Sequence, residues 1–137
     1  MIPVAVSLVI VSHSCKLAEG VAELAAQMAG EKTIIATAGG AADGSLGTSV
    51  DKVLQALARA ESADGVLVLV DLGSAGMAVE MALESLSAEQ RERVQVSSAP
   101  LVEGAIIAAV EASIGRSLKE VAEAAANAQT LNKFPER

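Results

Sequence analysis

The only histidine of the chain, His13, is the side chain best suited to proton or group transfer near neutral pH. It follows the apolar run Val4–Val11 and precedes a segment with helical periodicity. Parallel α/β proteins collect their ligands and reacting groups at such junctions, where a strand ends and a helix begins. We therefore take His13 as the candidate catalytic residue.

Asp71 occupies the same kind of position, directly after the apolar run Val66–Val70. If the first and third strands are neighbours, their carboxyl ends meet and Asp71 lies beside His13. A carboxylate that accepts the Nδ1–H of a histidine fixes the tautomer and leaves Nε2 with an available lone pair. We predict this pair, with Nε2 as a nucleophile toward a phosphoryl group.

A phosphoryl group needs hydrogen-bond donors, and serines and glycines surround both strand ends. Serine hydroxyls and the N–H groups that open the helices after His13 and Gly73 can supply them. The glycine-rich loop Gly39–Gly47 forms a third wall and a surface for partners. The candidate phosphate-binding or partner-binding residues are Ser12, Ser14, Gly39, Gly40, Gly44, Gly47, Thr48, Gly73 and Ser74.

Other chemistries have weaker support. The glycine-rich loop matches neither Walker A spacing nor a GxGxxG fingerprint, and no GxSxG elbow is present. One cysteine and one histidine are too few for a structural zinc site, and we expect no metal, although Asp43 and Asp71 are possible magnesium ligands. Cys15 has two readings, a partner of His13 or a small residue at a helix start, and the role of Lys16 stays open.

The composition limits the class of protein. With 137 residues, 52% of them hydrophobic, the chain fits one compact domain. A net charge of −7 and a single aromatic residue, Phe134, argue against nucleic-acid binding and against anionic membranes. The first apolar run has no Lys or Arg before it and follows Pro3, so it is read as a buried strand and not a secretory signal. We expect a soluble, cytoplasmic protein.

Strands and helices alternate along the chain, which predicts a doubly wound α/β fold. This fold has three layers, with helices on both faces of a mainly parallel four-stranded sheet of order 2-1-3-4. The expected strands are Val4–Val11, Thr33–Ala38, Val66–Val70 and Val94–Ser98. The expected helices are Lys16–Met28, Thr48–Leu57, Met77–Ser85, Val102–Ala112 and Leu118–Ala128.

Spacing within the helices supports these assignments. The apolar residues of the first helix, at helical spacing, are Leu17, Val21, Leu24 and Met28. Capping-box spacing places helix starts at Thr48 with Asp51 and at Ser117 with Glu120. The tail from Thr130 is polar and is expected to fray.

Together, four motifs in register resemble a known family. They are Leu8–Ser14, Gly44–Thr48, Asp71–Ala75 and Ala99–Gly104. The chain resembles the DhaM-type phosphotransferase subunit of PEP-dependent dihydroxyacetone kinase, whose domain is similar to the IIA domain of mannose-type sugar phosphotransferase systems. This resemblance implies one mannose-type IIA domain over residues 1–137.

The resemblance also implies partners. His13 is expected to accept a phosphoryl group from the carrier HPr, in trans, and to pass it to ADP on a DhaL-type subunit, with a DhaK-type subunit holding dihydroxyacetone. ADP is then the partner's cofactor, and this chain binds none. A homodimer built on helices is expected, because no strand follows Ala128 for exchange between subunits. Two alternatives stay open, a IIA protein of a mannose-type sugar system and a non-catalytic regulatory module of the same fold.

Overall fold

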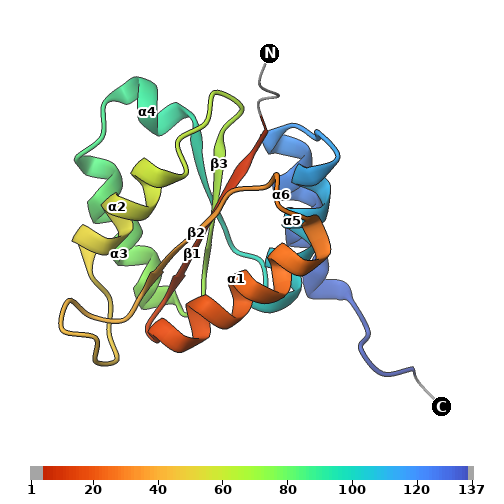
Figure 1. Cartoon of the computed structure of the whole chain (residues 1–137), viewed down its shortest axis with the longest axis horizontal. Helices are drawn as coiled ribbons and strands as arrows, with labels where there is room; N and C mark the ends of the chain where they lie inside the picture. Colours follow the sequence, from red (N-terminus) through yellow and green to blue (C-terminus); the bar gives the residue numbers. More distant parts are fainter. Residues whose placement is uncertain (1–4, 136–137) are drawn as a thin grey trace.

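The computed structural model describes residues 5–135 as a parallel sheet between two layers of helices (Figure 1). The sheet order is β2-β1-β3-β4, as the alternation of strands and helices predicted. All three strand pairings are parallel. The strands are β1 (Ser7–Ser12), β2 (Ile35–Gly39), β3 (Val66–Val70) and β4 (Val94–Ser97). The helices are α1 (Cys15–Ala29), α2 (Val50–Arg59), α3 (Gly73–Glu84), α4 (Ala88–Glu92), α5 (Leu101–Ser113) and α6 (Leu118–Ala126), followed by a 3-10 turn (Asn127–Thr130).

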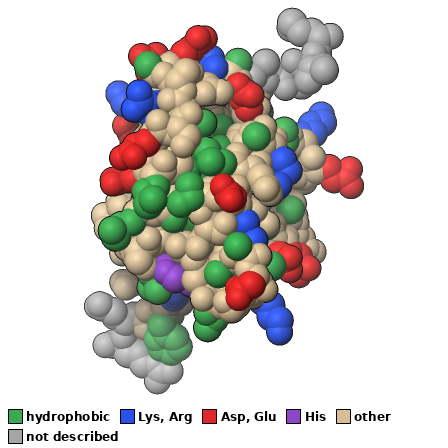
Figure 2. Space-filling view, turned by 90° about the vertical axis from the view of Figure 1, so that its left-hand side faces the viewer, with side chains coloured by type: hydrophobic (Ala, Val, Ile, Leu, Met, Phe, Trp, Pro, Cys, Tyr) green, Lys and Arg blue, Asp and Glu red, His purple; other side chains and the backbone are tan. Residues whose placement is uncertain are grey.

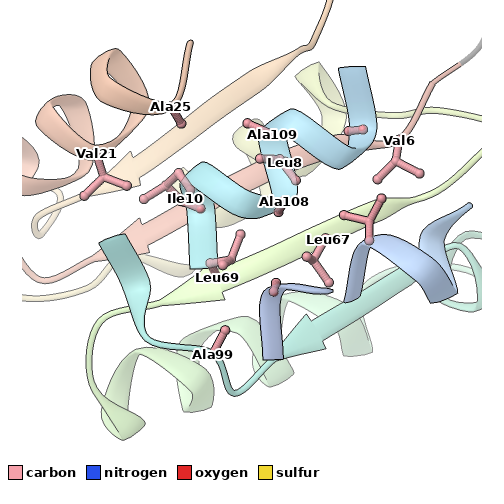
Figure 3. Packing of buried hydrophobic residues seen from close by; sticks show 14 of the residues in the cluster. Val6, Leu8, Ile10, Val21, Ala25, Leu67, Leu69, Ala99, Ala108 and Ala109 are labelled. Carbon is pink, nitrogen blue, oxygen red and sulfur yellow. The ribbon is translucent and has the colours of Figure 1, made fainter. Parts of the chain in front are cut away.

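The two faces of the sheet bury separate hydrophobic clusters. Figure 1 shows α2, α3 and α4 on one side of the sheet and α1, α5 and α6 on the other. In β1, Leu8 and Ile10 face the α1, α5 and α6 layer (Figure 3), whereas Val9 and Val11 face the other layer. Because successive side chains of a strand point to opposite faces, a strand covered on both faces is apolar throughout.

Alanine and glycine let the helices lie close to the sheet. The buried residues of α5 are Gly104, Ala105, Ala108, Ala109 and Ala112. In α1, the buried residues are Ala18, Val21 and Ala25. Three of the apolar residues that predicted this helix are therefore on the outside, with Leu17, Leu24 and Met28 at 42%, 46% and 60% exposure. The spacing predicted the helix correctly, but the small residues face the sheet.

Several expected boundaries need correction. The first strand begins at Ser7, and the expected start at Val4 lies outside the described residues. Thr48 does not cap α2. Ser49 does, because its extended backbone aims its hydroxyl at the N–H of Lys52, 3.2 Å away. The third helix starts at Gly73, one turn earlier than Met77, because the chain turns into the helix at Leu72, its N-cap residue.

The sequence patterns did not predict one short helix in the second half of the chain. The short helix α4 was not predicted, although Ser87 and Gln90 form a capping box there. The capping box of Ser117 and Glu120 at α6 is confirmed. No helix among the described residues is both long and apolar enough to cross a bilayer.

Gly104 gives a direct test of the close packing between α5 and the sheet. A Cβ at this position would lie 2.7 Å from the Cβ of Ala99 and 3.1 Å from Cδ2 of Leu69. We expect Gly104→Val to lower the free energy of unfolding by roughly 1–3 kcal/mol through overpacking. Gly20→Ala is the matched control, because nothing lies within 4 Å of its Cβ position and the change should raise stability by about 0.5–1 kcal/mol. Urea unfolding measures both, and equal effects would contradict the packing argument.

Candidate active site

The structure brings His13 and Asp71 together across neighbouring strands. His13 follows β1, Asp71 follows β3, and the backbone N–H of Asp71 donates to the carbonyl of Val11 over 3.1 Å. His13 Nδ1 lies 3.0 Å from Oδ1 of Asp71. With a proton on Nδ1 shared with the carboxylate, Nε2 keeps its lone pair.

Asp71 is held by several donors besides the ring. Its Oδ2 accepts from the hydroxyl of Ser12 and from the backbone N–H of His13, each over 2.9 Å. Its Oδ1 also accepts from the N–H of Leu72 over 2.7 Å. Burial by itself raises the pKa of Asp71, but these hydrogen bonds, with those of His13 foremost, outweigh burial and lower the pKa below its ordinary value. The carboxylate is therefore charged and fixed in orientation at neutral pH.

The other ring nitrogen faces Ser74. The hydroxyl of Ser74 lies 2.8 Å from Nε2 of His13, and it donates to that nitrogen when the ring carries its proton on Nδ1. The His13 side chain is 27% exposed. Figure 2 shows the single histidine at the surface with hydrophobic side chains close by. The ring edge is thus open to a partner, as expected for transfer between proteins.

The start of α3 can hold an anion beside the ring. No side chain caps this helix, because its N-cap residue is Leu72. The N–H groups of Gly73 and Ser74, in the first turn, therefore remain available to an external acceptor. The hydroxyl of Ser74, from the same helix turn, contacts Nε2, so this turn adjoins the ring.

The glycine-rich loop holds the backbone of the site. The N–H of Gly40 donates to the carbonyl of Ser12 over 3.0 Å, and the N–H of Gly47 donates to the carbonyl of His13 over 2.8 Å. Gly40 has a φ of +79°, which favours glycine. Gly39, which was expected to begin the loop, is instead the last residue of β2, since that strand runs from Ile35 to Gly39 and not from Thr33 to Ala38. It lies against the start of α1, where a Cβ would come within 2.6 Å of Cα of Cys15. Gly40 and Gly47 thus act on the backbone next to and at His13, whereas the hydrogen bonds of its ring go to Asp71 and Ser74.

Other predicted residues have different roles or lie apart. The hydroxyl of Ser14 caps α1 by accepting from the N–H of Leu17 over 3.1 Å, and its own N–H donates to Ser12. Gly44 belongs to an exposed turn in which Asp43 accepts from Ser45. No hydrogen bond within the described part of the chain joins Gly44 or Thr48 to His13 or Asp71.

The thiol of Cys15 is hydrogen-bonded to Glu19 and not to His13. Its Sγ donates to Oε1 of Glu19 over 3.4 Å. This hydrogen bond, followed by the negative charge of Glu19, raises the pKa of the Cys15 thiol. A raised pKa keeps the thiol protonated and unreactive. Of the two readings of Cys15, the helix-start residue is the one that the geometry favours.

Sequence reasoning missed the N–H of Leu72 as a donor to Asp71 and two exposed apolar side chains next in sequence to residues bonded to His13. Leu46 and Leu72 are 81% and 60% exposed, and each adjoins a residue that is hydrogen-bonded to His13, namely Gly47 and Asp71. Exposed apolar side chains beside a reactive group are typical of surfaces that bind other proteins. Their positions within loops gave no periodic signal from which to predict them.

Comparisons with known proteins agree with this fold. The family model described as "PTS system fructose IIA component" matches residues 7–122, so the chain belongs to the IIA family of the phosphotransferase system. A crystal structure of a protein of unknown function is 32% identical, with a TM-score of 0.83 over 96% of this chain and 99% of the other.

Within that family, the chain is similar to DhaM subunits. It is 36% identical to the phosphoryl donor subunit DhaM of PEP-dependent dihydroxyacetone kinase 2 from Listeria innocua, over 89% of this chain and 98% of that protein. It is 45% identical to DhaM from Escherichia coli over 85% of this chain. That second match spans 25% of the Escherichia coli protein, so this chain corresponds to about a quarter of its length.

The lowered pKa of Asp71 predicts how stability depends on pH. Asp71 binds its proton less tightly when folded, so its stabilisation is complete above the unfolded pKa of about 3.9 and is lost as pH falls through the lower folded value. We expect Asp71→Asn to be less stable than the unmodified chain at pH 6, with the difference shrinking below about pH 4. Urea unfolding from pH 3 to 7 measures this difference, with the exposed-site variant Asp64→Asn as control. A difference that stays constant over that range would refute the assignment.

Proposed function

We propose that this chain is the phosphoryl carrier of a PEP-dependent dihydroxyacetone kinase system. In this proposal, Nε2 of His13 accepts a phosphoryl group from phosphorylated HPr and passes it to ADP bound on a DhaL-type subunit. The observation that carries the proposal is the ring itself, with Nδ1 bound to Asp71, Nε2 beside the Ser74 hydroxyl, and one edge exposed. The name of the relatives, phosphoryl donor subunit, supports the same direction of transfer.

The uptake step is an in-line displacement at phosphorus. The lone pair of Nε2 forms a bond to phosphorus while the bond between phosphorus and the donor's histidine nitrogen breaks. The ring becomes more positive as the new bond forms, and the adjacent Asp71 carboxylate stabilises that charge. Catalysis therefore consists mainly of positioning and charge stabilisation.

The phosphoryl oxygens need donors once the group is transferred. The Ser74 hydroxyl must leave Nε2 for the bond to phosphorus to form, and it can then donate to a phosphoryl oxygen. The N–H groups of Gly73 and Ser74 at the start of α3 add backbone donors at the positive end of the helix dipole. The hydrogen bonds from these donors strengthen when the negatively charged phosphoryl group is on Nε2, and they therefore stabilise the phosphorylated state.

Transfer to ADP then forms ATP on the partner, which phosphorylates dihydroxyacetone held by a DhaK-type subunit. ADP therefore belongs to the partner's site in this proposal. The exposed side chains Leu46 and Leu72 provide the surface for both phosphoryl partners. The exposed row Leu17, Leu24 and Met28 on α1 provides a surface for a homodimer built on helices.

A phosphorylation assay tests the uptake step. Incubated with phosphoenolpyruvate, enzyme I and HPr, the chain should gain an acid-labile, base-stable phosphate, and His13→Ala should gain none. Asp71→Asn should take up phosphate about 10–100-fold more slowly, because it loses the charged partner of the ring. Asp64→Asn, at an exposed position before β3 and so at the opposite end of that strand from Asp71, is the control. A base-stable phosphate that persists in His13→Ala would end the proposal.

The same preparation identifies the acceptor. Phosphorylated chain is mixed either with a DhaL-type subunit and ADP or with the IIB subunit of a mannose-type sugar system. Formation of ATP in the first mixture supports the proposed acceptor. Transfer to the IIB subunit alone would assign the chain to sugar transport. A chain that takes up no phosphate but binds the DhaL-type subunit would be a regulatory module.

Ser74→Ala tests the hydroxyl beside Nε2. We expect phosphate uptake to slow by about tenfold, because the phosphoryl group loses one charge-assisted hydrogen bond. Rapid-quench measurement of the phosphorylated fraction gives the rate. Ser98→Ala, at an exposed serine between β4 and α5, is the matched control. Equal rates for the two variants would show that Ser74 does not stabilise the transferred group.

A further inference from the structure

The free edge of β2 carries an arrangement that the proposed function does not use. Among residues 5–135, this strand pairs only with β1, and no described strand lies along its other edge. The carbonyl of Ile34 and the N–H of Gly40 bond to β1. Because successive residues of a parallel strand direct their backbone groups to alternate sides, those of Thr37 and Gly39 face the free edge.

Two cationic side chains from α2 lie along this edge. Lys52 Nζ donates to the carbonyl of Gly39 over 3.0 Å, and Arg59 Nη2 donates to the carbonyl of Thr37 over 3.0 Å. Neither side chain belongs to any ion pair between residues that the structure describes. The chain has more carboxylates than basic side chains, with a net charge of −7, yet these two cations bind carbonyl groups and form no ion pair with a described carboxylate.

A cavity of about 200 Å³ lies between these groups. Its lining residues are Cys15, Thr37, Gly39, Lys52, Gln55 and Arg59. The charged and amide side chains are at positions 52, 55 and 59 of α2, spaced by three and four residues, so they share one face of the helix. The volume suits a small molecule and is below that of pockets for drug-sized ligands.

The hydrogen-bonding groups of this cavity select the chemistry of its occupant. An added β-strand would need both the N–H and the C=O groups of the β2 edge, and two of those carbonyls are already occupied by Lys52 and Arg59. Two carboxylates lie close to this cavity, that of Glu19 on the Cys15 thiol and that of Asp43 within reach of the Lys52 charge. What remains on the wall itself is a set of donors: the edge N–H groups of Thr37 and Gly39, the two cations and the Gln55 amide. Donors of this kind match a ligand whose polar atoms only accept hydrogen bonds. A guanidinium together with backbone N–H groups is suited to phosphate oxygens in particular.

We propose that this cavity is a second anion site, which binds a small phosphate-type oxyanion at the β2 edge independently of His13. It lies one strand away from the catalytic strand, since Gly39 pairs with Ser12 in the sheet. Cys15 belongs to its wall and begins α1, two residues after His13. The donors of this cavity come from β2 and α2, whereas those beside His13 come from the start of α3, so the two sets are separate.

The site is tested by titrating the chain with inorganic phosphate and following backbone amide signals by NMR, with sodium chloride at equal ionic strength as reference. Saturable shifts are expected at Thr37 and Gly39, and they should persist in His13→Ala. That variant separates this site from the donors at the start of α3, whose signals are those of Gly73 and Ser74. Loss of the proposed phosphoryl uptake would leave this result unchanged.

Gln55→Glu gives the most direct variant, because it places a carboxylate in the cavity wall on the same helix face as Lys52 and Arg59, where it repels an anion and competes with it for the two cations. We expect phosphate affinity to fall at least tenfold. Gln27→Glu makes the same charge change at an exposed position of α1 and should bind as the unmodified chain does. Arg59→Gln, checked for an unchanged melting temperature, should also lose about tenfold in affinity.

Three outcomes would overturn the proposal. The first is the absence of saturable shifts at Thr37 and Gly39. The second is an equal affinity of Gln55→Glu and Gln27→Glu for phosphate. The third is equal displacement of the same signals by chloride, which would show that Lys52 and Arg59 serve only to protect the sheet edge from pairing.

Discussion

The hydrogen bond between Asp71 and His13 is the interaction on which the candidate site depends. It joins the ends of β1 and β3, so the parallel pairing of these strands fixes the distance between the two side chains. The carboxylate also accepts from Ser12 and from two backbone N–H groups, and it cannot rotate without losing several bonds at once. One charged group thus fixes the tautomer of the ring and ties it to the sheet.

The rest of the fold supports this contact through close packing. Small residues on α1 and α5 bring both helices against one face of the sheet, and the valines of β1 and β3 fill the opposite cluster. Rigid strands then hold the loops that carry the chemistry. Since α1 uses Ala18 and Ala25 toward the sheet, its larger apolar residues are left for solvent or for another protein.

Particular residues show how far prediction from the sequence reached. Asp71 and Ser74 were predicted near His13 because strand order places their segments together, and the structure places both within hydrogen-bond distance of the ring. Thr48 was predicted as a cap because its spacing to Asp51 fits one, yet Ser49 has the same chemistry one residue later and takes that position. Local patterns locate an element well but do not distinguish two adjacent residues with similar side chains.

The sequence by itself determined the alternation of strands and helices and the identity of the single imidazole, because these follow from periodicity and residue type. The sheet order was then predicted from the usual topology of doubly wound folds, and the structure confirms it. Only the tertiary structure decided which hydroxyl contacts Nε2, which glycines hold the backbone, and that Lys52 and Arg59 lie along the edge of β2. These contacts join residues distant in sequence, and their geometry is set by helix packing, which leaves no repeating pattern along the chain.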